Sequence, residues 1–208
     1  MVTLTFYTYK KGFGWLGFLA MGWMRVPLLL DNRITFWKLM GVGQPGFKPQ
    51  GNGSEWAMLI VWKSSPQTNT WWQKILKAKA SAVDFQLQPL FGHGLWSGRD
   101  PFGHLKRDGI QSKKIAVLTR ASIKWNKAKL FWQSVPAVAD DLNSSFKPEF
   151  SAGIGEIPYI RQATFSIWSS EQEMKNFAYQ HEAHKKVIEM TKQHNWYTEE
   201  LFYRFAVV

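Results

Sequence analysis

The feature of this sequence that most constrains its fold is an internal repeat. Three pairs of short strings match between the two halves in the same order, namely Leu4-Thr5 with Leu118-Thr119, Gly41–Gly43 with Gly153–Gly155, and Ala57–Trp62 with Ala163–Trp168. In each half a serine-rich helix start follows the tryptophan, at Ser64–Pro66 and at Ser169–Glu171. Because the matches keep their order at similar offsets, the sequence predicts a duplicated fold.

Hydrophobic patterning predicts the same succession of elements in both halves. The expected strands are Thr3–Tyr9, Thr35–Leu39, Trp56–Trp62 and Val83–Leu90, and then Ile115–Ile123, Phe150–Ile154, Gln162–Trp168 and Leu201–Val207. The expected helices are Gly14–Met24 and Thr68–Ala80, and then Lys127–Trp132 and Glu171–His194. Each half therefore has the order β-α-β-β-α-β of a ferredoxin-like unit.

We accordingly expect an α+β fold in which two tandem ferredoxin-like repeats pack sheet to sheet around a barrel-like interior. Residues 1–92 are the expected first half, and residues 115–208 are the expected second half. Residues 93–114 form a glycine-rich, basic connector that could fold over a pocket.

Composition excludes several kinds of chemistry. Cysteine is absent, so disulfides, thiolate zinc sites, iron–sulfur clusters and cysteine nucleophiles are excluded. The 12 tryptophans exceed what an ordinary core needs and indicate a large flat ligand or an amphipathic interface. The formal charge of +11 favours an anionic partner or surface.

The uncharged segment Gly12–Met24 is rich in aromatic residues but is too short to span a bilayer, which takes about 20 residues. It is either a buried helix or a helix that lies on a membrane surface, with Lys10, Lys11 and Arg25 near anionic headgroups. The N-terminus has no cleavable signal pattern. We therefore expect a cytoplasmic protein, with peripheral contact at the inner membrane as an open alternative.

His181 and His184 are the candidate metal ligands. The last long helix carries Met174, Phe177 and Ile188 on one apolar stripe, and His184 lies near the middle of that stripe. Such an imidazole is a hydrogen-bonded core residue, or it shares a metal with His181 at i, i+3, or it is the single axial ligand of a haem. A haem also needs an apolar slot, expected between the two halves, and cations for its propionates. His93, His104 and His194 are expected to be solvated.

Strings along nearly the whole chain together resemble the spheroidene monooxygenase family. They are Phe36–Leu39, Trp96–Gly98, Pro101–Phe102, Val117–Ala121, Phe131–Trp132, Val135–Pro136, Gly153–Pro158, Gln162, Thr164–Trp168, and a tail from Phe177 through Trp196 and Glu199–Glu200 to Phe205. The resemblance implies a haem b oxygenase that uses dioxygen and an electron donor such as ferredoxin to place a keto group on an acyclic carotenoid or similar apolar substrate. It also implies the dimeric α/β-barrel architecture, with haem between a sheet and a helix, and His184, or else His181, as axial ligand.

Further site residues follow as hypotheses. Lys38 and Arg120 are single cations in apolar strands, so each would contact a haem propionate or would face outward, and Arg99 is a third candidate cation. Gln162 would hydrogen-bond bound oxygen or be a structural amide. Trp96 and Phe102 would pack on the porphyrin or substrate, or simply in the core.

Other classes of function stay open. The alternatives are a haem-binding protein without oxygenase activity and a cofactor-independent monooxygenase on the same scaffold. A nucleic-acid partner is not expected, because the basic residues are dispersed and no RNP-type string is present. The sequence is compatible with a monomer or a homodimer.

Overall fold

A computed structural model describes residues 1–10, 12–44, 48–67, 69–105, 112–134, 148–180, 189–191 and 193–208. The first half contains β1 (Val2–Tyr9), α1 (Trp15–Trp23), α2 (Arg25–Leu30), β2 (Ile34–Gln44), β3 (Lys48–Trp62), α3 (Trp71–Lys77) and β4 (Ala80–Gly94). A short 3-10 helix, η1 (Gly103–Leu105), follows β4.

The second half contains β5 (Ile115–Ile123), η2 (Trp125–Lys127), β6 (Phe150–Ile157), β7 (Arg161–Trp168), α5 (Glu171–Gln180) and β8 (Tyr197–Val207). Residues 128–134 are also helical and continue from η2. All eight strands that we expected from the sequence are present, and several extend further than predicted.

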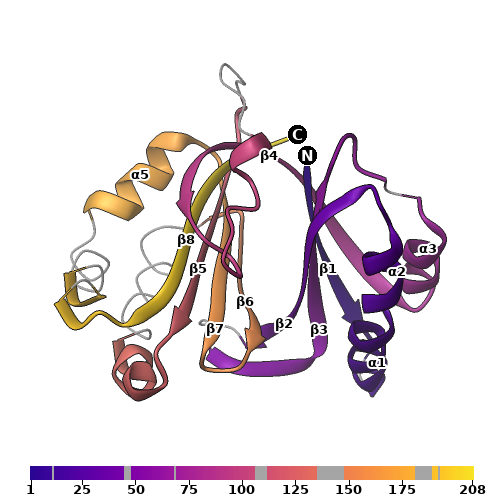
Figure 1. Ribbon diagram of the computed structural model, residues 1–208, viewed down its shortest axis with the longest axis horizontal. Coiled ribbons are helices and arrows are strands. Elements are labelled where there is room, and N and C mark those ends of the chain that lie inside the picture. The colour runs from indigo at the N-terminus through magenta and orange to yellow at the C-terminus, as the bar shows by residue number, and fades with distance from the viewer. Residues whose placement is uncertain are drawn as a thin grey trace.

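The strands form one closed antiparallel barrel in the order β1-β3-β2-β6-β7-β5-β8-β4 (Figure 1). Within each half the central pair is the first and third strand, as a ferredoxin-like unit requires. The halves meet where β2 pairs with β6 and where β4 pairs with β8. The predicted duplicated α+β fold is therefore confirmed, and the hydrogen-bonded edges close the barrel.

The barrel interior is a packed core. Its inward-facing residues come from all eight strands and include Phe6, Leu59, Leu118, Phe165 and Phe205, each less than a tenth exposed. Phe6 and Phe165 rings lie 6.1 Å apart across the interior. The prediction of an apolar slot between the two halves is therefore wrong, because aromatic side chains from both sheets fill that space.

The outer face of the first sheet is covered by helices. Trp56, Met58 and Ile60 on β3 are about 1% exposed and pack beneath the helical layer. The segment that we expected to end at Arg25 continues as α2, with Pro27 in its first turn, where the missing N–H breaks no helical hydrogen bond. On this side of the molecule α1, α2 and α3 lie together (Figure 1).

Candidate functional site

A buried ion pair lies at one end of the barrel interior. Arg120 on β5 is 4% exposed, and its Nη1 donates to Oε1 of Glu199 on β8. Its Nη2 lies 3.7 Å from Oε1 of Glu156 on β6. The side chain points inward because it continues the alternation of Ala116 and Leu118 on β5. A guanidinium at this depth requires fixed anions, and two carboxylates of this chain supply them.

Lys38 and Trp96 join the same group, which we call the inner polar cluster (Lys38, Trp96, Arg120, Glu156 and Glu199). Lys38 Nζ donates to Glu156 Oε2 at 2.8 Å and to Ser97 Oγ at 2.7 Å. Trp96 is fully buried, and its Nε1 donates to Glu156 Oε1 at 2.7 Å. Lys38 and Arg120, which we expected either to contact a haem propionate or to face outward, are thus held by glutamates that nothing in the sequence singled out.

Glu199 also anchors the segment that follows β4. Its carboxylate accepts from the backbone amides of Ser97 at 3.0 Å and Gly98 at 2.7 Å. Burial by itself would raise the pKa of Glu199, but these amides and the charge of Arg120 outweigh burial, so the pKa lies below its ordinary value. The carboxylate therefore fixes a backbone turn in which Ser97 has a φ of 58°.

Arg99 and Phe102 lie near this cluster but differ in their surroundings. The Arg99 guanidinium lies over the Phe36 ring, 4.9 Å from its centroid, at the barrel end. Phe102 is fully buried and packs edge-on against Tyr203 and Phe205. Trp96 and Phe102 are thus core packing residues, which was one of the two alternatives that the sequence left open.

The outer face of the second sheet differs from that of the first. Its central strands present a set of short or polar side chains, which we call the small-residue face: Thr119, Ala121, Gly153, Gly155, Gln162, Thr164 and Ser166. All of them are partly exposed. In register across the sheet, Gly153 pairs with Thr164, Thr164 with Thr119, and Thr119 with Phe202.

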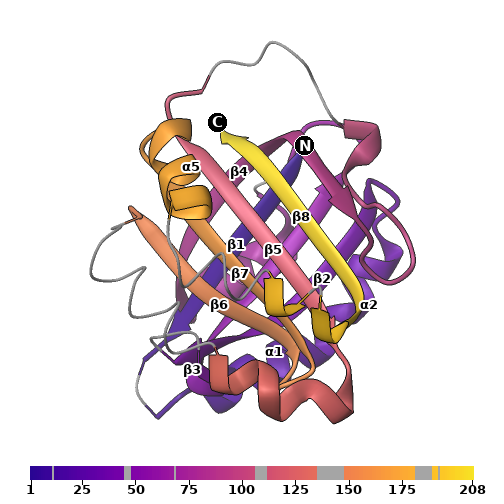
Figure 2. The same ribbon diagram turned by 90° about the vertical axis from the view of Figure 1, so that its left-hand side faces the viewer.

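Described helices flank this face but leave its middle uncovered (Figure 2). At one end α5 packs on Trp168, whose ring stacks on Phe177 at 5.3 Å, and Met174 is buried beside it. Helical residues 128–134 lie toward the other end (Figure 2). The Thr119 and Thr164 hydroxyls bond to each other at 2.5 Å, so each is the hydrogen-bond partner of the other.

The duplication provides an internal comparison for this face. The repeat matches Met58 with Thr164 and Ile60 with Ser166. In the first half these positions are buried under helices, whereas in the second half they are small and partly exposed. Among the described residues, the same scaffold therefore carries bulky side chains beneath helices in one half and short, partly exposed side chains in the other.

Among the predicted site residues that the structure describes, Gln162 is the one on the small-residue face. Its Nε2 donates to the Ile157 carbonyl at 2.8 Å, which holds the amide at the end of β7. The inner polar cluster lies on the other side of the sheet, because neighbouring residues of a strand point to opposite faces. One flat ligand on the outer face cannot contact both Gln162 and Arg120.

His181 and His184 lie outside the described residues, so their assignment as iron ligands stays a prediction. Of the other histidines, His93, His104 and His194 are exposed as expected. Within the described ranges, no three histidine or carboxylate side chains gather as a metal-ligand cluster.

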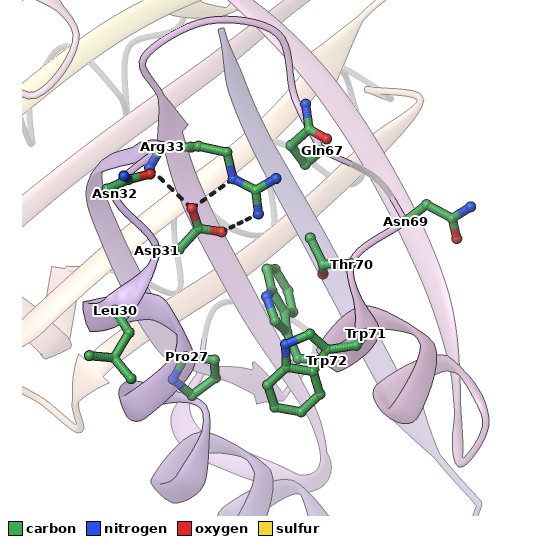
Figure 3. A pocket seen from close by; sticks show the side chains of 10 residues that line it. All are labelled: Pro27, Leu30, Asp31, Asn32, Arg33, Gln67, Asn69, Thr70, Trp71 and Trp72. Atoms are coloured by element: carbon green, nitrogen blue, oxygen red, sulfur yellow. Dashed lines mark hydrogen bonds and ion pairs between the residues drawn. The ribbon is translucent and has the colours of Figure 1, made fainter.

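A separate polar pocket of about 560 Å³ lies between the end of α2 and the start of α3 (Figure 3). Its charged residues neutralise each other, since Arg33 Nη2 lies 2.6 Å from Asp31 Oδ2. Asn69, Thr70 and Trp71 form the opposite wall. The pocket contains none of the predicted site residues, and its two charged side chains, Asp31 and Arg33, are paired with each other.

The closed barrel of two ferredoxin-like halves defines a dimeric α/β-barrel protein with both halves in one chain. Sequence comparison then identifies the group within that class. The chain is 33% identical over 192 residues to the spheroidene monooxygenase of Rhodobacter capsulatus, covering 88% of this chain and 80% of that protein. It is 33% identical over 184 residues to the spheroidene monooxygenase of Cereibacter sphaeroides, covering 85% and 56%. The chain belongs to the spheroidene monooxygenase family.

Other comparisons concern the fold. No family model matches the sequence. An aldoxime dehydratase in complex with butyraldoxime aligns with 99% of this chain and 78% of its own, at a TM-score of 0.61 and 11% identity. A second aldoxime dehydratase structure gives a TM-score of 0.60 at 12% identity, covering 99% and 80%. At such identity the likeness supports the architecture alone.

Proposed function

We propose that this chain is a monooxygenase that inserts oxygen, as a keto group, into an acyclic carotenoid or a similar long apolar molecule. Membership of a family whose curated members are named spheroidene monooxygenase supports the reaction class. The observation that carries the proposal within this structure is the small-residue face, where the second half lacks the bulky side chains of the first.

Haem b is the proposed cofactor, bound against that face. The side chains present fit a flat apolar ring system: Thr119 and Thr164 satisfy each other, and Ala121, Gly153 and Gly155 project little from the sheet. When bound, haem supplies the activation of dioxygen, with electrons from an external donor such as ferredoxin. His184, with His181 as the alternative, follows α5 in the sequence and is the residue that would bind the haem iron.

This chain's own residues have the tasks of binding and orientation. A flat apolar ring system gains from a surface without unpaired charge, and the Thr119–Thr164 pair provides one at the centre of the sheet. Gln162 supplies a fixed amide at the rim, where it could hydrogen-bond an oxygen-bearing group. The inner polar cluster acts from behind the sheet by fixing β5, β6 and β8 relative to one another.

The test combines absorption spectroscopy with turnover. Haem b is added to the purified protein, to Thr164→Met, and to Thr8→Met as a control at an exposed threonine of β1. We expect a Soret band for the wild type and the control, and at least roughly a tenfold loss of haem affinity for Thr164→Met, because a filled face excludes the ring. His184→Ala should remove the band, whereas loss only in His181→Ala moves the ligand to His181.

Turnover separates the competing functions. Oxidation of an acyclic carotenoid that needs haem, reductant and dioxygen supports the proposal. A haem-bound protein without turnover is the non-oxygenase alternative, and oxidation by the colourless protein is the cofactor-independent one. Unchanged haem binding by Thr164→Met would contradict the location of the site.

A further inference from the structure

Helix α1 places its small residues inside and its large apolar residues outside. Gly17 and Ala20 face the sheet, and a Cβ on Gly17 would lie only 3.3 Å from the Trp56 ring. Phe18 is 75% exposed, and Trp15 and Leu19 are each 58% exposed. A globular protein ordinarily buries such side chains first, so this orientation indicates that the outer stripe of α1 contacts something apolar.

The neighbouring helices α2 and α3 also expose large apolar side chains. The Trp23 ring of α1 stacks on the Trp71 ring of α3 at 6.1 Å, which joins the two helices. We call the whole set the apolar helical surface: Phe13, Trp15, Phe18, Leu19, Val26, Leu29, Leu30, Trp71 and Ile75. Leu30 is 79% exposed, and the three helices α1, α2 and α3 that carry most of this set lie on one side of the molecule (Figure 1).

The charged side chains carried by helices α1, α2 and α3 have a single sign. The sequences of α1, α2 and α3 contain no acidic residue, whereas Arg25 and Lys74 are exposed on them. A groove of about 870 Å³ borders the surface at Leu29 and is lined by the cations Arg25, Arg99 and Arg161. It also contains Glu156, which is already paired with Lys38 and Arg120. Exposed apolar side chains that lie on the same helices as cations without acidic partners in those helices match an anionic amphipathic partner.

We propose that the apolar helical surface binds the face of an anionic phospholipid bilayer. Tryptophan, phenylalanine and leucine enter the boundary between headgroups and acyl chains, and Arg25, Lys74 and the basic groove contact lipid phosphates. A second copy of this chain fits less well, because it would bring further cations against helices α1, α2 and α3, whose sequences contain no acid. Contact is peripheral, since no helix among the described residues is long and apolar enough to cross a membrane.

Cosedimentation with lipid vesicles tests this surface without reductant, dioxygen or carotenoid, so its outcome is independent of the proposed oxidation. The purified chain is mixed with vesicles of phosphatidylcholine and phosphatidylglycerol, or of phosphatidylcholine alone. We expect stronger binding to the anionic vesicles. Phe18→Ser with Leu19→Ser should lower binding at least roughly tenfold, because two exposed apolar side chains no longer enter the lipid.

Matched variants separate lipid binding from other effects. Phe91→Ser removes an exposed phenylalanine of β4, outside the surface, and should bind like the wild type. Arg25→Gln with Lys74→Gln should reduce binding to anionic vesicles roughly tenfold and leave the neutral vesicles unaffected. Thermal unfolding shows that each variant is folded, as expected for substitutions at exposed positions.

Three results would overturn the proposal. The first is a wild-type chain that binds neither kind of vesicle. The second is a folded Phe18→Ser, Leu19→Ser variant that binds anionic vesicles as well as the wild type does. The third is a wild-type chain that forms a dimer in analytical ultracentrifugation and does not bind vesicles, while the Phe18→Ser, Leu19→Ser variant is a monomer. A second copy of the chain would then cover the surface.

Discussion

Arg120 on β5 and Glu199 on β8 form an ion pair inside the barrel, across two adjacent strands. The repeat matches Arg120 with Phe6, so the first half has an aromatic ring where the second half has a charge. Glu199 in turn holds the amides of Ser97 and Gly98. The Glu199 carboxylate thereby joins β5 and β8 to the segment that follows β4, so we expect it to stabilise this end of the barrel.

Glu199→Gln should destabilise the fold by about 2 kcal/mol at neutral pH, because the substitution leaves a buried guanidinium with one fewer anion. Urea-induced unfolding measures the change. Glu200→Gln, at the exposed neighbouring position, is the control and should stay within about 0.5 kcal/mol of the wild type. Equal stability of the two variants would show that the pair contributes nothing net.

The same carboxylate should contribute to acid sensitivity. The pKa of Glu199 in the folded chain lies below its ordinary value of 4.5, so the unfolded chain binds the proton more readily. The stability that it confers is present above about pH 4.5 and is lost as the pH falls toward the folded pKa. The wild type should therefore lose more stability than Glu199→Gln between neutral pH and acid, as urea unfolding across that range measures.

Exchanging the matched residues of the two outer sheet faces should change the free energy of unfolding much more on the first sheet than on the second. Met58→Thr should cost about 2–4 kcal/mol, because it opens a cavity and buries a hydroxyl beneath the helices. Thr164→Met should change stability by less than about 1 kcal/mol, because its position is partly exposed. Thermal or urea unfolding compares them, and a large loss in Thr164→Met would mean that its face is already closely packed.

Substitution by alanine should lower the stability of the chain at one glycine and raise it at another. A Cβ on Gly92 of β4 would lie 2.4 Å from the Phe202 carbonyl oxygen and from Tyr203 Cγ, so Gly92→Ala should destabilise by about 2–3 kcal/mol. Gly22 in α1 has nothing within 4 Å of that position. Gly22→Ala should stabilise the chain by about 0.5–1 kcal/mol through helix propensity. Denaturation curves of both variants check the pair, and a stable Gly92→Ala would contradict the strand spacing.

Most of the fold could be predicted because its elements repeat. Two matched copies of Ala57–Trp62 fixed the central strands, and alternation assigned their inner and outer faces. Helix α2 was missed because Pro27 reads as a terminator in sequence, although the first turn of a helix tolerates proline. The closing contacts between β2 and β6 and between β4 and β8 join the halves, and strand pairing of that range has no local signal.

The candidate site was predicted less well. Lys38 and Arg120 were expected at a haem propionate or facing outward, and their actual partners, Glu156 and Glu199, lie far from them in sequence. The small-residue face could have been found by comparing the matched positions of the two halves of the repeat. Met58 against Thr164 and Ile60 against Ser166 already show the loss of bulk.

The sequence by itself determined that there are two like halves, which residues alternate inward along each strand, and that cysteine chemistry is absent. Only the tertiary structure decided that the interior is filled, that the inner polar cluster satisfies its own charges, and that Gln162 lies on the opposite side of the sheet from it. The physical reason is range. Periodicity and propensity act over a few neighbouring residues, whereas burial and ion pairing depend on which distant strands the closed barrel places side by side.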